Sequence, residues 1–250
     1  MAIKPMRLPG WPTGIACVLL AAGSVASWAR DEGDRPQLQL INGSDQAVEV
    51  FWLNPTGERA PHGPIPPGDD MVITTTIGHR FLVVGRRDRS ETVVTSEVPI
   101  QAYRIGGVPA FYTQRVETHG FPIVGSARVS PFALAEAAYL IDLMLAKRPD
   151  LREAMIKSGS RLCVLAWNES RPEFPGLSGR DYWDARARGL GGSETDPLCT
   201  CGEENLLGYD GDPYATECIL IHEFAHHIHL RGMNNVDPTF DARLKRTYDS

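Results

Sequence analysis

Two histidines and a glutamate near the end of the chain form an HExxH motif at residues 222–226. His222 and His226 are four residues apart, so on a helix they lie on one face, close enough to bind one metal ion. Glu223 lies between them and can accept a proton from a water that the metal activates. The run from Ile219 to Ile228 is otherwise almost entirely apolar, where unpaired polar groups are costly to bury. The pattern predicts a Zn²⁺ site with His222 and His226 as ligands and Glu223 as the catalytic base.

A catalytic zinc ion needs a third protein ligand and an open coordination position. The spacing found in metzincins would place a histidine at position 232, where this chain has Gly232, so that class is excluded. His229 lies two helical turns beyond His222, which is too far for both to share one ion. Asp237 and Asp241 follow the expected helix end at Gly232, so both are candidates for the third ligand.

The composition is that of an ordinary globular protein. The chain has 250 residues, of which 42% are hydrophobic and 22% charged, enough for one large or two small domains. The net charge is -6, and the sequence contains no cluster of Lys and Arg. These features argue against nucleic acid as a partner.

The first 29 residues resemble a secretory signal peptide. Lys4 and Arg7 give a basic start, and an apolar run from Gly14 to Ala26 follows. This run is too short to cross a bilayer comfortably. We therefore expect a secreted or periplasmic protein with no stable membrane span once residues 1–29 are removed. An uncleaved membrane anchor is the alternative.

Four cysteines remain after that removal: Cys163, Cys199, Cys201 and Cys218. In an exported chain they permit two disulfides, with three possible pairings. Cys199 and Cys201 are too close in sequence to expect a bond between them. A cysteine metal site is a weaker interpretation, because the C-x-C pair lacks a second pair of ligands.

The first half of the chain has the patterning of β-structure. Segments rich in Val, Ile and Thr, several of them alternating between apolar and polar residues, are separated by Gly, Pro and Asn. The expected strands cover residues 37–41, 47–53, 71–76, 80–84 and 92–98. Short strands at this spacing predict a small β-sandwich over residues 36–100.

The second half changes to a helical period. We expect a helix over 131–147 capped by Ser130, a second over 150–157, and a motif helix over 213–230 that begins after Asp212. A strand is expected over 161–167 and mostly loop over 171–203. The expected fold class is α+β, with a small β-sandwich followed by a mostly helical domain over 103–250.

Part of the first half resembles a known peptide-binding module. The segments Trp52-Leu53-Asn54, Gly57-Glu58, Pro66-Pro67-Gly68 and Gly78-His79 are similar to the β domain of the von Hippel–Lindau tumour suppressor. That family binds a hydroxyproline-bearing peptide. The resemblance implies a peptide-binding surface made of Trp52, His62, Thr75, His79 and Phe81. The family has tyrosine, serine and tryptophan where this chain has His62, Thr75 and Phe81, so the polar cradle for a hydroxyl is altered.

The second half resembles a family of secreted, lethal-factor-like gluzincins. The similarity rests on residues 120–126, 202–207 and 219–229, and it implies a zincin-like metallopeptidase domain over 103–250. In gluzincins the third zinc ligand is a glutamate on a later helix, and 237–241 resembles the stretch that leads to it. The expectation is therefore a domain incomplete at its C-terminus. A degenerate homologue with a two-histidine site is the alternative.

The sequence thus predicts an exported, zinc-dependent metallopeptidase that hydrolyses peptide bonds in a peptide or protein substrate. Its N-terminal β-sandwich is expected to bind substrate or a partner. One alternative is a secreted peptide-binding protein that uses the β-sandwich and carries a vestigial or incomplete metal site. Another is a structural or interaction protein with no metal.

Overall fold

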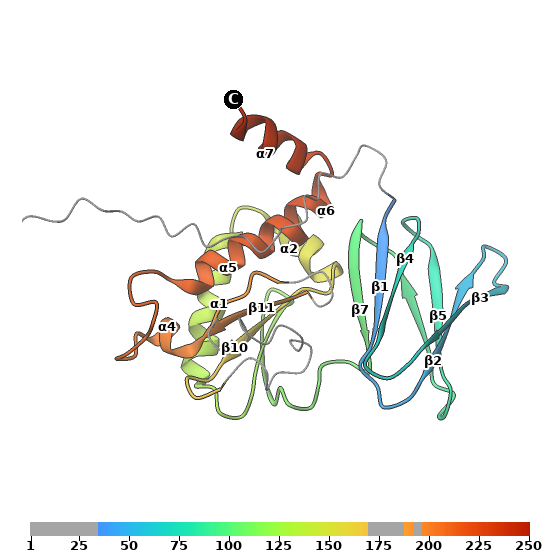
Figure 1. Cartoon of the computed structure of the whole chain (residues 1–250), viewed down its shortest axis with the longest axis horizontal. Coiled ribbons are helices and arrows are strands. Elements are labelled where there is room, and N and C mark those ends of the chain that lie inside the picture. Colours follow the sequence, from blue (N-terminus) through green and yellow to red (C-terminus); the bar gives the residue numbers. More distant parts are fainter. Residues whose placement is uncertain (1–34, 170–187, 193–196) are drawn as a thin grey trace, which may run out of the picture.

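The computed structural model describes residues 35–169, 188–192 and 197–250, and within them the fold is α+β with three β-sheets. Two of the sheets form a sandwich that lies beside a third sheet carrying most of the helices (Figure 1). The signal peptide expected over 1–29, and much of the loop expected over 171–203, lie outside the described residues. Among the described residues no helix is long and apolar enough to cross a membrane.

The first half is a β-sandwich with one shared core. Its sheets have the strand orders β4-β1-β7 and β3-β2-β5-β6. The strands are β1 (Gln37–Asn42), β2 (Val48–Leu53), β3 (Arg59–Ile65), β4 (Asp70–Thr74), β5 (Arg80–Gly85), β6 (Glu91–Thr95) and β7 (Ile100–Ile105). Leu38, Val50 and Phe81 are among the buried residues that both sheets contribute to the core.

Five of these strands match the expected segments, whereas β3 and β7 were not expected. The β3 sequence contains Pro61, Gly63 and Pro64, which conceal its pattern and are tolerated because β3 is an edge strand. Strand β7 pairs in parallel with β1, so the sandwich extends to Ile105 rather than ending at residue 100.

The expectation of a mostly helical second half is wrong, because a four-stranded sheet lies at its centre. The strands are β8 (Gln114–Thr118), β9 (Phe121–Gly125), β10 (Arg161–Leu165) and β11 (Leu198–Gly202), in the order β11-β10-β9-β8. Strands β9, β10 and β11 are parallel, and β8 is antiparallel to β9. Parallel strands are buried on both faces and lack alternation. Strand β10 matches the strand expected over 161–167, whereas β8, β9 and β11 were not expected.

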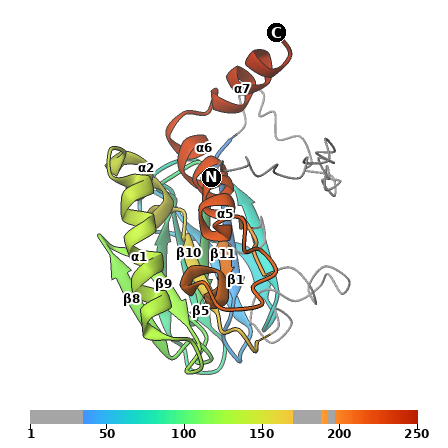
Figure 2. The same ribbon diagram turned by 90° about the vertical axis from the view of Figure 1, so that its left-hand side faces the viewer.

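The helices of the second half pack mainly on one face of this sheet. They are α1 (Pro131–Leu145), α2 (Pro149–Lys157), α4 (Glu203–Leu207), α5 (Ile219–His227), a π-helical turn η2 (Ile228–Met233), α6 (Asn234–Val236) and α7 (Phe240–Tyr248). Figure 2 shows α1 and α5 side by side in front of the sheet. Phe224 of α5 meets Phe121 of β9 edge to face in the core between them. Helix α7 stands away from both parts and has no buried residue (Figure 1).

Local sequence signals predicted α1 well and the motif helix poorly. Ser130 caps α1 by accepting a hydrogen bond from the Phe132 backbone, as expected. The motif helix begins at Ile219 rather than 213, because Asp212 accepts the Tyr214 N–H in a separate turn.

The chain also stays helical beyond Gly232, where we expected the motif helix to end, and continues through the π turn to Val236. A Cβ added at Gly232 would lie 3.4 Å from Met155 Cγ. This glycine therefore lies inside the helical run, where a Cβ would meet α2 at an ordinary distance, and it does not terminate the helix.

Hydrogen bonds join the two parts along the outer edge of β7. The Asn235 side chain accepts the Ile100 N–H at 2.6 Å and donates to the Ile100 carbonyl at 3.1 Å. The Ala102 N–H donates to the Ser158 carbonyl at 3.0 Å. These contacts cover main-chain groups of an otherwise open sheet edge, and they tie the end of the motif helix to the sandwich.

Candidate metal centre

The HExxH residues lie on α5 as the sequence predicts, but on its outer face. The His222 and His226 ring centroids are 5.1 Å apart, and both side chains are exposed to solvent. Leu220 and Phe224 form the opposite, fully buried face of the helix. The argument that a metal must compensate for buried histidines is therefore wrong. The face that carries the two histidines is open to solvent.

The two histidines have the chemistry that a divalent cation requires. Partial burial, followed by the charges of His222 and His229, lowers the pKa of His226 below its usual value. This favours the neutral imidazole, which is the form that binds metal. His222 Nδ1 is 3.8 Å from a carboxylate oxygen of Glu217. Two neighbouring imidazoles are ligands of the type that a zinc ion takes.

A short segment, residues 188–192, lies beside the motif and extends the sheet beyond β11. Leu190 and Thr200 exchange two main-chain hydrogen bonds, of 3.3 and 2.9 Å, in antiparallel orientation. We call residues 188–192 the edge segment. It passes so close to α5 that a Cβ at Gly189 would lie 2.7 Å from Glu223 Oε1, and one at Gly191 would lie 2.5 Å from His226 Cβ. Glycine is needed here because no side chain fits.

His227 fixes the edge segment from the buried side of α5. Its side chain is fully buried, and Nδ1 lies 3.2 Å from the Gly191 carbonyl oxygen. Burial lowers the pKa of His227 to about 3, so the ring is neutral and Nδ1–H donates to that carbonyl. The histidine next to the motif is therefore a structural contact and not a metal ligand.

A run of polar residues after β11 positions the surrounding helices. The Glu203 carboxylate accepts the backbone N–H of Ser130 at 2.6 Å and of Trp167 at 3.0 Å, and so fixes the start of α1. The Asn205 side-chain oxygen accepts the N–H of Ile219 at 2.8 Å, which fixes the start of α5. In the sequence, Glu203 and Asn205 are only part of a family resemblance, and no role is predicted for them. The signal that could have indicated a role is the run of three polar residues directly after the buried strand β11.

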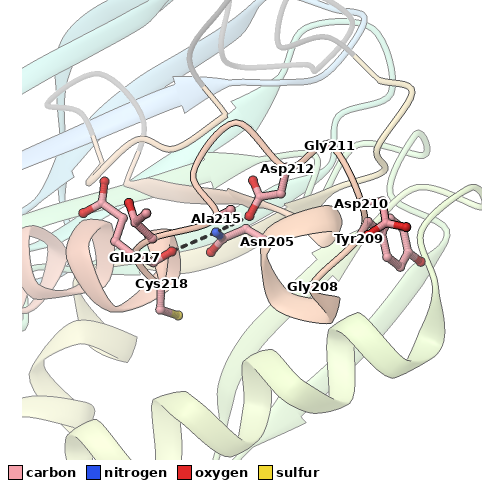
Figure 3. Close-up of a pocket in the computed structure, with 10 residues that line it drawn as sticks. Asn205, Gly208, Tyr209, Asp210, Gly211, Asp212, Ala215, Glu217 and Cys218 are labelled. Carbon is pink, nitrogen blue, oxygen red and sulfur yellow. Dashed lines mark hydrogen bonds between the residues drawn. The ribbon is translucent and has the colours of Figure 1, made fainter. Parts of the chain in front are cut away.

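The loop between α4 and α5 borders a polar cavity of about 570 Å³. Figure 3 shows the Asn205 side chain between Asp212 and the start of α5. Its amide donates to Asp212 Oδ2 at 2.8 Å and to the Glu217 carbonyl at 2.9 Å. The cavity thus lies at the N-terminal end of the motif helix, next to the residue that approaches His222.

The two candidate third ligands make other contacts in this structure. Asp237 forms an ion pair with Arg243 at 2.6 Å. Asp241 Oδ1 lies 2.5 Å from His229 Nε2. Across residues 35–169, 188–192 and 197–250, no group of three His, Cys, Asp or Glu side chains is placed to hold a metal ion. Ligation by Asp237 or Asp241 stays a prediction, and each carboxylate would have to leave its present partner.

The five residues implied by the von Hippel–Lindau resemblance fall into a group of three and a pair. The rings of Trp52 and His79 are 5.4 Å apart, and His79 Nδ1 is 3.2 Å from Thr75 Oγ1. His62 meets Phe81 edge to face at 5.5 Å. Of these five residues, Trp52 and His79 line a cavity of about 480 Å³ at the end of the sandwich. Phe81 is instead buried in the core.

The structure has Cys163, Cys199, Cys201 and Cys218 as thiols rather than disulfides. Cys199 and Cys201 lie in the core beneath the helices, and Cys163 lies in a separate cluster with Leu165 and Leu198. The alternation of β10 and β11 puts these clusters on opposite faces of the sheet. A bond from Cys163 to Cys199 or Cys201 would therefore disrupt the strands.

The described residues thus bring two exposed imidazoles, a half-buried carboxylate and an antiparallel sheet edge together. Such an arrangement can hold a divalent cation, take up a proton and align an extended chain. Comparison with protein-family models gives no matching family, and comparison with curated proteins gives no significant match.

Proposed function

We propose that this protein is an exported, zinc-dependent peptidase in which His222 and His226 bind zinc and Glu223 is the general base. The observation that carries the proposal is the placement of these side chains on one solvent-exposed face of α5 with the edge segment beside them. The Glu223 carboxylate lies against the main chain of Gly189. A base in that position is next to any chain that pairs with the edge segment.

The edge segment suggests how a peptide would be held. Leu190 directs both of its main-chain groups at Thr200. In an antiparallel ladder the main-chain groups of the preceding residue, Gly189, point the other way. An extended peptide can add to such an edge by main-chain hydrogen bonds, which places its scissile bond over α5.

Each proposed residue has a separate chemical role. Bound zinc supplies Lewis acidity, which activates water and polarises the substrate carbonyl. Glu223 accepts the proton of the attacking water and returns it to the leaving amine. His222 and His226 would hold the ion through neutral imidazole nitrogens.

The test is metal content and cleavage by the full chain and its variants. We expect about one zinc per chain in the wild type and loss of the zinc in His226→Ala. The control, His119→Ala, removes an exposed histidine that is distant from the motif in sequence and is expected to keep the metal. Glu223→Gln is expected to retain zinc and lose cleavage of a peptide library read by mass spectrometry. A wild-type chain that binds no zinc, or a Glu223→Gln variant that cleaves at the wild-type rate, would refute the proposal.

A second function, peptide binding by the sandwich, is favoured by the cavity beside Trp52 and His79. An aromatic ring next to an imidazole suits an extended peptide. Binding of this kind would persist in the presence of a chelator and in Glu223→Gln, and would be lost in His79→Ala. Peptide capture that disappears with the metal would instead assign binding to the motif surface.

A further inference from the structure

We infer that Arg188 is a positioning residue that holds the edge segment at the working distance from Glu223, and so sets the affinity for an extended peptide substrate. This inference rests on the proposed peptidase function. Arg188 is the first residue of the edge segment, directly before Gly189. Its side chain points into the protein and not toward the motif.

The Arg188 guanidinium is bound on several sides. Its Nε and Nη2 donate to the two carboxylate oxygens of Glu204, at 2.6 and 2.8 Å. Nη2 also donates to the Ala166 carbonyl at 2.8 Å, and Nη1 donates to the Glu169 carbonyl. The planar guanidinium thus binds acceptors from the segments that follow β10 and β11. A lysine ammonium, which acts as a point charge, cannot make this set of contacts.

The ion pair is sheltered from solvent, so it fixes geometry more firmly than a surface pair would. The Arg188 side chain is 15% exposed and that of Glu204 is 10% exposed. Glu204 directly follows Glu203, which fixes the start of α1. One end of the edge segment is therefore fastened to the frame of the second half, while His227 fastens the other end through Gly191.

Small displacements of the edge segment matter because it lies in contact with the motif. The Gly189 main chain already occupies the space next to the Glu223 carboxylate. Release of Arg188 would leave the edge segment held by the two Leu190–Thr200 bonds and by the His227 contact at Gly191. The end of the segment at Gly189 would then be able to shift relative to α5, whereas the proposed metal-binding histidines would remain in place on their helix.

Arg188→Lys tests this role, because lysine keeps the charge but cannot bridge the four acceptors. Hydrogen exchange at the Leu190 and Thr200 amides is expected to speed up at least about tenfold. Zinc content is expected to stay at the wild-type value. The KM for a cleaved peptide is expected to rise about five-fold or more with kcat changed less than about two-fold, the pattern of lost binding common to ground and transition states.

Arg128→Lys is the matched control, since Arg128 donates to the Glu169 carboxylate at 2.9 Å from the side of α1. Arg128→Lys is expected to leave the KM and the rates of hydrogen exchange at the Leu190 and Thr200 amides unchanged. If Arg188→Lys fails to fold, the double variant Arg188→Leu with Glu204→Leu removes both charges together and carries the same expectation.

If the wild type cleaves peptide, two results would overturn the inference about Arg188 and leave the proposed function standing. One is unchanged hydrogen exchange at the Leu190 and Thr200 amides of Arg188→Lys, and the other is faster exchange with an unchanged KM. Absence of both zinc and cleavage in the wild type would instead overturn the proposed function.

Discussion

The side-chain oxygen of Asn205 accepts a hydrogen bond from the backbone N–H of Ile219, the first residue of α5, at 2.8 Å. Cys218, at the N-cap position, makes no side-chain hydrogen bond to the helix. Asn205 therefore satisfies one of the first N–H groups of the helix, which have no partner within the helix. The start of the motif helix depends on a residue 14 positions earlier in the chain.

Replacement of Asn205 by alanine is expected to weaken the start of α5. It removes the acceptor for Ile219 and the amide that donates to the loop, so we expect a loss of about 1–2 kcal/mol in the free energy of unfolding. Zinc affinity should fall as well, because His222 lies in the first turn. Urea unfolding and zinc titration measure the two effects.

Two variants sharpen that experiment. Asn205→Asp keeps an acceptor oxygen for Ile219 and is expected to retain most of the zinc affinity. Asn54→Ala removes a similar set of turn hydrogen bonds, to Thr56 and Glu58 in the sandwich, and should leave zinc affinity unchanged. Equal zinc affinity in Asn205→Ala and the wild type would show that the contact does not position the motif.

Helix α1 and the HExxH face could be predicted because their signals are local. Ser130 and Pro131 mark the start of α1 directly in the sequence, and the spacing of His222 and His226 alone places them on one helical face. The edge segment could not be predicted, because its position depends on Leu190 pairing with Thr200. Neither residue has a periodic neighbourhood that indicates this pairing.

The exposure of the motif was equally hidden from the sequence. The run around His222 is apolar throughout, yet Ile221 is 45% exposed while Leu220 is fully buried. Composition describes the helix as a whole, and only the packing of α5 on β11 and α1 selects which face is covered. The roles of Arg188 and Asn205 are also tertiary, since each acts on a different element.

The free energy of unfolding is expected to decrease as the pH is lowered, because of His227. Its folded pKa is about 3, below the ordinary histidine value near 6.5. Between these values the unfolded chain binds a proton that the folded chain does not, so stability is complete above about pH 6.5 and is lost as the pH falls toward 3. The slope from this one group is at most about 1.4 kcal/mol per pH unit.

Carboxylates also titrate in this window, so the comparison is made with His227→Gln, in the presence of a chelator. The glutamine amide can still donate toward Gly191, but it carries no titrating group. Thermal unfolding of the wild type should lose more stability between pH 7 and 4 than that of the variant. Parallel curves would mean that the His227 ring is protonated in the folded protein.

Thiol labelling is expected to separate Cys218 from the other three cysteines. Burial raises the pKa of Cys199 and Cys201 well above the ordinary thiol value, and Cys163 is buried too. Under native conditions at pH 8, a thiol reagent should modify only Cys218 of these four, and urea should expose the rest. Peptide mass spectrometry reads the sites, with Cys218→Ser as control. A disulfide-linked peptide, or native labelling of Cys199, would contradict this expectation.

The edge segment lies in contact with His226, one of the two proposed metal ligands. A Cβ at Gly191 would lie 2.5 Å from His226 Cβ and 3.2 Å from the Glu223 carbonyl oxygen, so Gly191→Ala must push the segment away from α5. We expect weaker zinc binding and slower cleavage, because His226 and the peptide-pairing edge are displaced together. Gly232→Ala is the control, since its Cβ would meet Met155 at an ordinary 3.4 Å. If both variants bind zinc and cleave peptide like the wild type, the edge segment does not lie against the motif in solution, and the peptide would have to be aligned by another surface.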